Sequence, residues 1–146
     1  MRLRDILSIK GNDTVKVLKS HTLAEAIAVM TSKGVGSALV VDNNNEIAGI
    51  VTERDVLRFC SRNPSELDKT NVKSIMTSDL IVGIPDDDVE TMIATMVENR
   101  FRHLPVLEDG KLVGLVSMGD LVKSQLSAVK VENRYLKDYI SGSYPR

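Results

Sequence analysis

The chain has 146 residues, of which 19 are basic and 20 acidic, so its formal net charge is −1. This length fits one compact domain or two very small ones. Hydrophobic residues make up 42% and charged residues 27%, which disfavours a disordered or collagen-like chain. The balanced charge and the aromatic content of 3% disfavour a nucleic-acid-binding protein, because such a protein needs a cationic surface and stacking side chains.

The sequence also argues against a membrane or secreted protein. No apolar run approaches the ~20 residues of a membrane span, and the first residues turn polar too early for a signal peptide. Cys60 is the only cysteine, so an internal disulfide cannot form and nothing indicates an oxidising compartment. With only His21 and His103 beside it, we expect no metal site. We predict a cytoplasmic protein with neither a membrane nor a nucleic-acid partner.

An internal repeat organises the chain. The apolar residues of 23–30 have the spacing of one helix face, and those of 89–96 repeat it after a shift of 66 residues. Further on, GIVT at 49–52 matches GLVS at 114–117 after a shift of 65. The first copy therefore has one extra residue in the turn between, where a length change is tolerated.

Each copy is predicted to form strand, helix, strand, strand and helix. The fold class is thus α/β (α+β), with two pseudo-twofold-related β-α-β-β-α repeats followed by a C-terminal helix. The opening strands are expected over Thr14–Leu18 and Leu80–Ile84. The later strands are expected over Ala38–Val41 and Ile47–Val51 in the first copy, and over Leu104–Leu107 and Leu112–Val116 in the second.

Local signals mark the ends of these elements. Thr22 with Glu25, and Asp87 with Glu90, have the spacing of capping boxes that begin the first helix of each copy. Pro105 cannot donate a backbone hydrogen bond, so its strand is expected to lie at a sheet edge or to begin there.

The predicted organisation has five parts. They are an N-terminal segment at 1–13, a first repeat at 14–60, a connector at 61–74, a second repeat at 75–126, and a C-terminal helix and tail at 127–146. Each half has roughly 60 residues and would bury little core alone. We therefore expect the halves to pack together and to form two related clefts.

A hydroxyl and a carboxylate recur where the last strand of each copy meets its second helix. Thr52 stands three residues before Asp55, and Ser117 three before Asp120. One interpretation is a capping box. The other is a ligand site, in which the helix start binds phosphate beside the hydroxyl and the aspartate accepts the hydroxyls of a ribose. Arg54 would add a charge-assisted hydrogen bond to the phosphate.

Glycine precedes both motifs, and Gly49 and Gly114 would allow a close approach of the backbone. The repeated signature is a glycine, two residues, a threonine or serine, two residues and an aspartate. It follows a helix and two strands and resembles a tandem pair of cystathionine-β-synthase (CBS) domains over about Thr14–Leu126. The segments RFRHLPV at 100–106 and SMGDLVK at 117–123 are similar to those of stand-alone bacterial or archaeal CBS-pair proteins.

This resemblance implies a regulatory module that is not an enzyme. Such modules bind adenosine-containing ligands such as AMP, ADP, ATP, NAD(H) or S-adenosylmethionine in the clefts between repeats, with no obligatory cofactor. It assigns Asp55 and Asp120 to ribose binding. It places the phosphate near Thr52 and Ser117. The candidate phosphate-binding cations, which charge alone suggests, are Arg54, Arg100, Arg102 and His103. It places the adenine pocket at Val17, Gly36, Ser37, Ala38, Ile84 and Leu104.

The two sites are expected to differ. Glu53 and Arg54 precede the first aspartate, whereas Met118 and Gly119 precede the second. The second cleft must therefore obtain a cation elsewhere, from the arginines at 100 and 102 or the histidine at 103. Glu53 would disfavour a polyphosphate if it points inward. We predict unequal affinities, with at least one cleft binding AMP or an AMP moiety.

The C-terminal helix has apolar residues at steps of four and three. This seam consists of Val122, Leu126, Val129, Asn133, Leu136 and Ile140, and Gly142 and Pro145 are expected to end the helix. A heptad seam with one polar position is typical of a helix pair. The helix either lies against its own domain or forms a homodimer contact.

Three functions remain open at this point. The first is a sensor whose nucleotide changes a dimer surface or the surface for a regulated partner protein. The second is a nucleotide-independent dimerisation or scaffold protein. The third, an enzyme, is disfavoured because the sequence offers no nucleophile–base pair, no metal cluster and no Walker-type loop.

Overall fold

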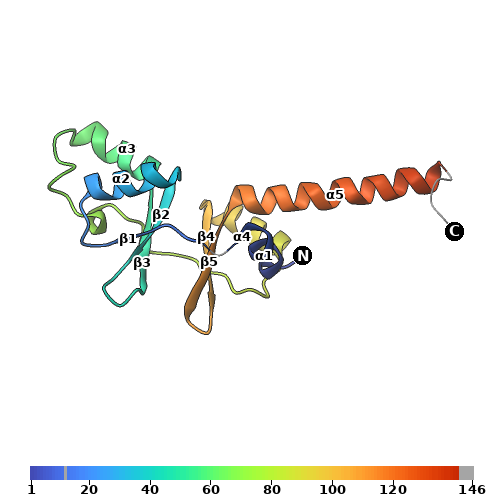
Figure 1. Cartoon of the computed structure of the whole chain (residues 1–146). Helices are drawn as coiled ribbons and strands as arrows, with labels where there is room; N and C mark the ends of the chain where they lie inside the picture. The colour runs from blue at the N-terminus through green and yellow to red at the C-terminus, as the bar shows by residue number, and fades with distance from the viewer. Residues whose placement is uncertain (12, 142–146) are drawn as a thin grey trace. The chain divides into compact units, whose positions relative to one another are not determined.

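The computed structural model describes residues 1–11 and 13–141 and divides into two compact units (Figure 1). The first-repeat unit consists of residues 13–81 and 110–112. The second-repeat unit consists of the described residues 1–11, 82–109 and 113–141. The N-terminal segment thus groups with the second repeat, and the connector groups with the first.

The first-repeat unit has the predicted order of strands and helices. Its elements are β1 (Lys16–Leu18), α2 (Leu23–Lys33), β2 (Ser37–Val41), β3 (Ile47–Thr52), α3 (Glu53–Arg62) and the 3-10 turn η1 (Val72–Ser74). The sheet has the order β1-β2-β3, with β1 parallel and β3 antiparallel to β2. Helices α2 and α3 pack on this sheet (Figure 1) around an aliphatic core.

Capping defines both ends of α2. The Thr22 hydroxyl accepts the N–H of Glu25 at 3.2 Å, and the Glu25 carboxylate accepts the N–H of Thr22 at 3.3 Å. The predicted capping box is therefore confirmed. At the other end Gly34 takes the left-handed conformation, with φ of 66°, which glycine adopts without steric cost.

The connector folds against the first repeat. Val72 is fully buried in the core of this unit. The N–H of Val72 donates to the carbonyl of His21, and the N–H of Leu23 donates to that of Thr70, both at 2.9 Å. These contacts explain why the chain after α3 belongs to the first-repeat unit.

The second-repeat unit adds an N-terminal helix to the repeat. Its elements are α1 (Leu3–Lys10), α4 (Val89–Asn99), β4 (His103–Glu108), β5 (Lys111–Ser117) and α5 (Met118–Ile140). Helix α4 begins one residue later than predicted. The side chain of Asp88 accepts the N–H of Thr91 at 3.0 Å, whereas Asp87 accepts the N–H of Ile84 at 2.8 Å. The predicted capping box of Asp87 with Glu90 is therefore wrong.

Pro105 explains why the second copy has a shorter sheet. In the first copy, the N–H of Leu39 donates to the carbonyl of Val15 at 2.9 Å. The matching position holds Pro105, which has no N–H to donate. The opening strand expected at 80–84 is accordingly reduced to one bridge between Gly83 and Val106. Strand β4 lies at the edge of a two-stranded sheet, as the proline predicts.

Gly49 and Gly114 serve packing within the chain. A Cβ at Gly49 would lie 2.6 Å from the carbonyl oxygen of Thr77, and a Cβ at Gly114 would lie 2.5 Å from Cδ2 of Leu7. The space beside each glycine is thus filled by a segment preceding a repeat. The predicted close approach at these glycines is therefore made by other segments of the same chain.

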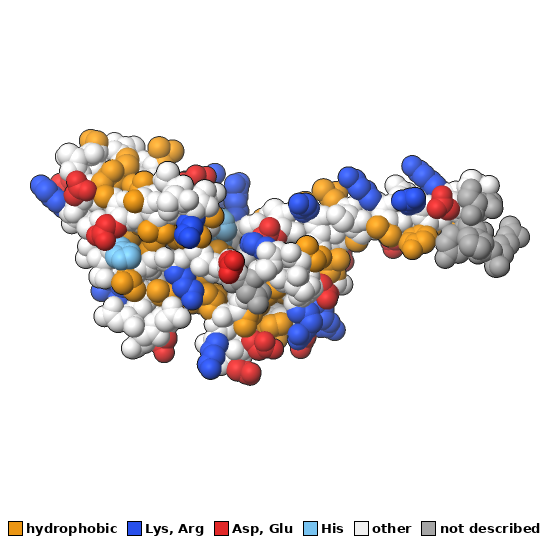
Figure 2. Space-filling model, in the orientation of Figure 1, with side chains coloured by type: hydrophobic (Ala, Val, Ile, Leu, Met, Phe, Trp, Pro, Cys, Tyr) orange, Lys and Arg blue, Asp and Glu red, His pale blue; other side chains and the backbone are white. Residues whose placement is uncertain are grey.

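Helix α5 presents its predicted seam to solvent. Only Leu121 of this helix is fully buried, whereas Leu126 is 57% and Ile140 is 82% exposed. Hydrophobic and basic side chains are visible together along α5 in Figure 2. The seam therefore does not lie against its own domain. The predicted helix end at Gly142 and Pro145 lies outside the described residues, and no described helix is long and apolar enough to cross a membrane.

Candidate functional site

The first candidate site begins where β3 becomes α3. The Thr52 hydroxyl accepts the N–H of Asp55 at 3.2 Å, and Oδ2 of Asp55 accepts the N–H of Thr52 at 2.9 Å. This is the capping box that the spacing predicted. The Thr52 hydroxyl also lies 3.0 Å from the same oxygen. Among the described residues, Oδ1 accepts no hydrogen bond, so capping leaves one carboxylate oxygen available for a ligand.

The predicted base-pocket segment lies beside this motif. Ser37 is the register partner of Thr52 across β2 and β3, and the carbonyl of Gly36 accepts the N–H of Glu53 at 2.9 Å. The side chain of Glu53 lies over Gly36, because a Cβ there would come within 3.0 Å of its Oε1. The side chain of Ala38 is buried in the core, so only its backbone can line a pocket.

The structure does not place Val17 at a ligand surface. Its side chain is 2% exposed and belongs to the core of the first-repeat unit. Ile84, the residue predicted for the same role in the second copy, is 53% exposed. Val17 and Ile84 are therefore not equivalent positions of the two copies. With the shift of 66 residues between the copies, the counterpart of Ile84 is Leu18, which is half-buried. The adenine pocket stays a prediction, in which the side chain of Leu18 is better placed than that of Val17 to meet a ligand.

The second candidate site repeats the capping box where β5 becomes α5. The N–H of Asp120 donates to the Ser117 hydroxyl at 3.1 Å, and Oδ2 of Asp120 accepts the N–H of Ser117 at 2.8 Å. The N–H of Met118 donates to the carbonyl of Arg102 at 2.8 Å, so the motif again adjoins the segment that enters the preceding strand. Leu104 is fully buried in the core and can contribute only backbone.

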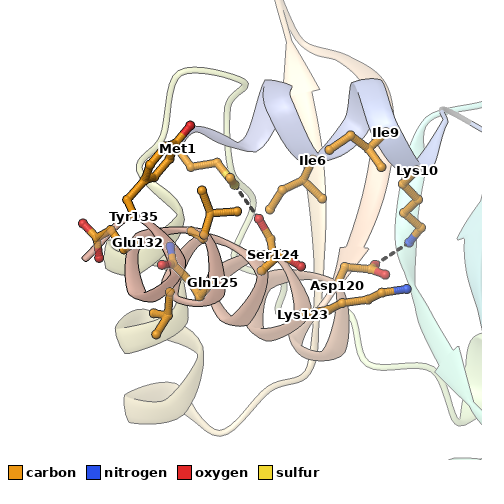
Figure 3. A pocket seen from close by; sticks show the side chains of 14 residues that line it. Met1, Ile6, Ile9, Lys10, Asp120, Lys123, Ser124, Gln125, Glu132 and Tyr135 are labelled. Atoms are coloured by element: carbon orange, nitrogen blue, oxygen red, sulfur yellow. Dashed lines mark hydrogen bonds and ion pairs between the residues drawn. The ribbon is translucent and has the colours of Figure 1, made fainter. Parts of the chain in front are cut away.

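A lysine distinguishes the second site from the first. Nζ of Lys10, at the end of α1, lies 2.6 Å from Oδ2 of Asp120 and donates to the carbonyl of Leu115 at 2.7 Å. Figure 3 shows the two side chains pointing toward each other. Sequence comparison of the copies could not find Lys10, because it precedes the repeats and stands 110 residues from Asp120.

This ion pair sets the charge state of the second site. Partial burial raises the pKa of Asp120, but the hydrogen bonds from Lys10 and Ser117 and the lysine's charge outweigh it and hold that pKa below its ordinary value. Burial, assisted by the charges of Lys10 and Arg102, lowers the pKa of His103, and Asp120 opposes this only in part. Asp120 is therefore ionised and His103 neutral near pH 7.

Among the described residues, none of the three cations predicted for the second site forms an ion pair with Asp120. Arg100 ends α4 in the left-handed conformation, with φ of 58°, and is exposed. Arg102 is also exposed, and its link to the motif is through its backbone carbonyl. His103 is half-buried at the start of β4. Among the described residues, only Lys10 forms an ion pair with Asp120.

Both aspartates border hollows of the surface. A hollow of about 460 Å³ adjoins Asp55 along α3, where Arg58, Phe59 and Arg62 also line it. A larger cavity, of about 910 Å³, lies between α1 and α5 (Figure 3). Lys10 and Asp120 line it together with apolar residues such as Ile9 and Val131.

The fold and the motifs together define a class of protein: a tandem β-α-β-β-α repeat in which each second helix begins at a hydroxyl–carboxylate box. A family model for the CBS domain matches residues 3–62 and 72–127. The chain therefore belongs to the CBS domain family. The match includes α1, which the resemblance over 14–126 had left out.

Three relatives illustrate this membership. The mitochondrial CBS domain-containing protein CBSX3 of Arabidopsis thaliana is 36% identical over 150 residues, which span 97% of this chain and 73% of that protein. A CBS-domain-containing protein from Agrobacterium tumefaciens is 30% identical, with a TM-score of 0.81 over 86% of this chain and 99% of that one. A CBS domain protein from Pyrobaculum aerophilum, solved in complex with AMP, is 26% identical, with a TM-score of 0.73 over 82% of this chain and 89% of that one. The cytoplasmic location stays a prediction.

Proposed function

We propose that this chain is a regulatory sensor that binds adenosine-containing nucleotides, AMP foremost, at its two hydroxyl–carboxylate boxes. One observation carries the proposal. Both boxes use a single carboxylate oxygen for capping, and the aspartate of each box lines a surface hollow. The AMP complex of the Pyrobaculum relative supports AMP as the first ligand to test. ATP, ADP and NAD(H) share the adenosine moiety and are the other candidates.

Each group of the nucleotide has a physically suited partner. The remaining oxygen of Asp55 or Asp120 can accept the hydroxyls of the ribose. The hydroxyl of Thr52 or Ser117 and the unpaired N–H groups of the helix start suit the phosphate, because a helix N-terminus carries a partial positive charge. Capping therefore prepares the site, since it fixes the carboxylate in one orientation before the ligand arrives.

The adenine would lie on the segments that enter β2 and β4. We propose the residues Leu18, Gly36, Ser37 and Ala38 in the first site and Ile84 and Leu104 in the second, with backbone contacts only from Ala38 and Leu104. Arg54 is exposed on the first turn of α3 and is the proposed phosphate cation of the first site.

Isothermal titration calorimetry with AMP tests this proposal. We expect two unequal sites in the wild-type protein, and the loss of one site in each of Asp55→Asn and Asp120→Asn. Loss of a charge-assisted hydrogen bond costs about 1.5–3 kcal/mol, so each affected site should weaken about 10- to 150-fold. Asparagine is preferred to alanine because its amide oxygen can still accept the capping N–H groups.

Asp109→Asn is the matched control. Asp109 is exposed in a turn with φ of 52°, a conformation that asparagine also tolerates. This variant should therefore bind AMP as the wild-type protein does. Two equal sites would contradict the predicted asymmetry. No heat and no thermal stabilisation with millimolar AMP, ADP, ATP or NADH would instead favour the nucleotide-independent scaffold.

We further propose that the chain forms a homodimer through the seam on α5. The support is that apolar side chains of the seam, such as Leu126, Leu136 and Ile140, are exposed in the single chain. A second copy offers the same heptad spacing, and its Asn133 can pair with Asn133 to fix the register. Light scattering should therefore report twice the chain mass, and Leu126→Asp should reduce it to one. A wild-type monomer would contradict the proposal.

A further inference from the structure

The second site lacks a cation in its own motif. At the first site Glu53 and Arg54 precede the aspartate, and the matching positions of the second hold Met118 and Gly119. Within the motif itself, a phosphate bound at the start of α5 would therefore find only backbone donors and the Ser117 hydroxyl. A nucleotide-binding site normally adds a cationic side chain, because charge-assisted hydrogen bonds to phosphate are about twice as strong as neutral ones.

Helix α1 brings a cation to this place. The ammonium group of Lys10 contacts Asp120 at 2.6 Å and the carbonyl of Leu115 at 2.7 Å. An ammonium group has three N–H donors, so the two observed contacts leave one for a further acceptor. The side chain is 37% exposed, so a ligand can reach it from solvent.

The position of Lys10 is fixed by packing. Leu3, Ile6 and Leu7 of α1 are buried in the core of the second-repeat unit, and Leu7 fills the space beside Gly114. Gly114 is on β5, the strand that leads into the second box. The helix that carries Lys10 is therefore held against the strand that positions Ser117, and the lysine is a preorganised part of the site.

Among the described residues, no lysine forms an ion pair with Asp55 of the first site. Met76 fills the space beside Gly49 as Leu7 does beside Gly114, so the two segments match with a shift of 69 residues. At this shift the counterpart of Lys10 is Asp79. Each site thus has one proposed cation, from its own motif in the first repeat and from α1 in the second.

We propose that Lys10 is the phosphate-binding cation of the second site and makes this site selective for nucleotides over nucleosides. The inference rests on the proposed nucleotide-binding function. Its rival is a latch, in which Lys10 only neutralises Asp120 and competes with the ribose for the carboxylate. The two roles predict opposite changes in ligand affinity when Lys10 is removed. Removal of a phosphate-binding cation lowers the affinity for AMP and leaves the affinity for adenosine unchanged. Removal of a latch raises the affinity for both ligands.

The test compares AMP with adenosine, which lacks the phosphate. Asp55→Asn serves as the background, so that calorimetry reports the second site alone. In it, Lys10→Met keeps the alkyl chain but removes the charge. We expect the affinity for AMP to fall about tenfold and the affinity for adenosine to change less than about twofold. Lys10→Arg should retain most of the AMP affinity. The matched control is Lys130→Met, an exposed lysine of α5, which should change neither ligand.

Two results would overturn the inference. Tighter binding of both ligands by Lys10→Met, or an equal change for both, would show that Lys10 acts on the carboxylate rather than on the phosphate. If the background variant with Lys10 intact binds neither ligand, the proposed function of the second site fails and the inference fails with it. This outcome can be told apart from a failure of the Lys10 inference alone, because it is measured in a protein that retains Lys10. Circular dichroism of each variant confirms that the fold is retained.

Discussion

Gly49 and Gly114 occupy matching positions but should respond differently to alanine. At Gly49 the new Cβ would lie 2.6 Å from a backbone oxygen, that of Thr77. The same oxygen accepts the N–H of Ile50 at 2.9 Å, and the N–H of Thr77 donates back to the carbonyl of Ile50 at 2.8 Å. At Gly114 the Cβ would meet Cδ2 of Leu7 at 2.5 Å, which is the end of a side chain and can move by rotation.

The structure gives a magnitude for each substitution. Overpacking costs about 1–3 kcal/mol, and displacement of Thr77 would also weaken two backbone hydrogen bonds of about 1 kcal/mol each. We therefore expect Gly49→Ala to lower the free energy of unfolding by about 2–4 kcal/mol. For Gly114→Ala, rearrangement of Leu7 is offset by the ~0.5–1 kcal/mol that alanine gains over glycine within a strand. Because a side-chain end can move, overpacking should cost no more than about 2 kcal/mol here, and the net loss should stay below about 1.5 kcal/mol.

Urea unfolding followed by circular dichroism measures the difference, and hydrogen exchange locates it. In Gly49→Ala the amides of Ile50 and Thr77 should exchange faster than in the wild type. Gly119→Ala is the control, because its Cβ would meet only the Ser117 hydroxyl at an ordinary 3.6 Å and alanine favours the helix. A loss of stability in Gly114→Ala as large as that in Gly49→Ala would refute the reasoning, as would unchanged exchange at Ile50.

Three further predictions concern charge and backbone conformation. Because the folded chain lowers the pKa of His103, the unfolded chain takes up its proton first, near pH 6.5. Stability should therefore fall as the pH drops below about 6.5, and less so in His103→Gln, as thermal melts at pH 7.5 and 5.5 would show. Arg100→Gly should raise the free energy of unfolding by about 0.5–1 kcal/mol, since it relieves a left-handed arginine; a lower melting temperature would contradict this. In an Asp120→Asn background, Glu53→Gln should raise the affinity for ATP more than the affinity for AMP. Equal changes of the two affinities in calorimetry would argue against an inward-facing Glu53 carboxylate.

Much of the fold was predictable because local signals and the repeat agree. The boxes at Thr52 and Ser117 form as the spacing predicts, since a cap depends only on residues three positions apart. The edge position of β4 follows from the missing N–H of Pro105. Asp88 rather than Asp87 caps α4, because three consecutive aspartates offer equivalent acceptors and tertiary contacts choose among them.

Other parts depend on contacts between distant segments. The Lys10–Asp120 pair joins residues 110 positions apart, and Lys10 lies before the first repeat, where comparison of the copies gives no signal. The burial of Val17 could not be predicted, because the alternation of a short strand does not say which face its neighbours will cover. Its side chain enters the core with Leu23 and Val51, and the following residue is left half-buried.

The same box can thus serve two sites of different character. In the first, a carboxylate from Glu53 lies over Gly36 and opposes the charge of Arg54, so each additional phosphate on a ligand adds repulsion as well as attraction. In the second, Met118 replaces that acid and Lys10 approaches from α1, but its charge is shared with Asp120. A phosphate would therefore share one ammonium group with a carboxylate, through the N–H donor that the two observed contacts leave, and that carboxylate is the group proposed to bind the ribose. AMP offers a partner to both members of this ion pair, since its ribose can donate to the carboxylate and its phosphate can accept from the ammonium group. A ligand that offers only one of the two groups contacts only one member of the ion pair. For this reason we expect the second site to discriminate more sharply than the first between a nucleotide and its nucleoside.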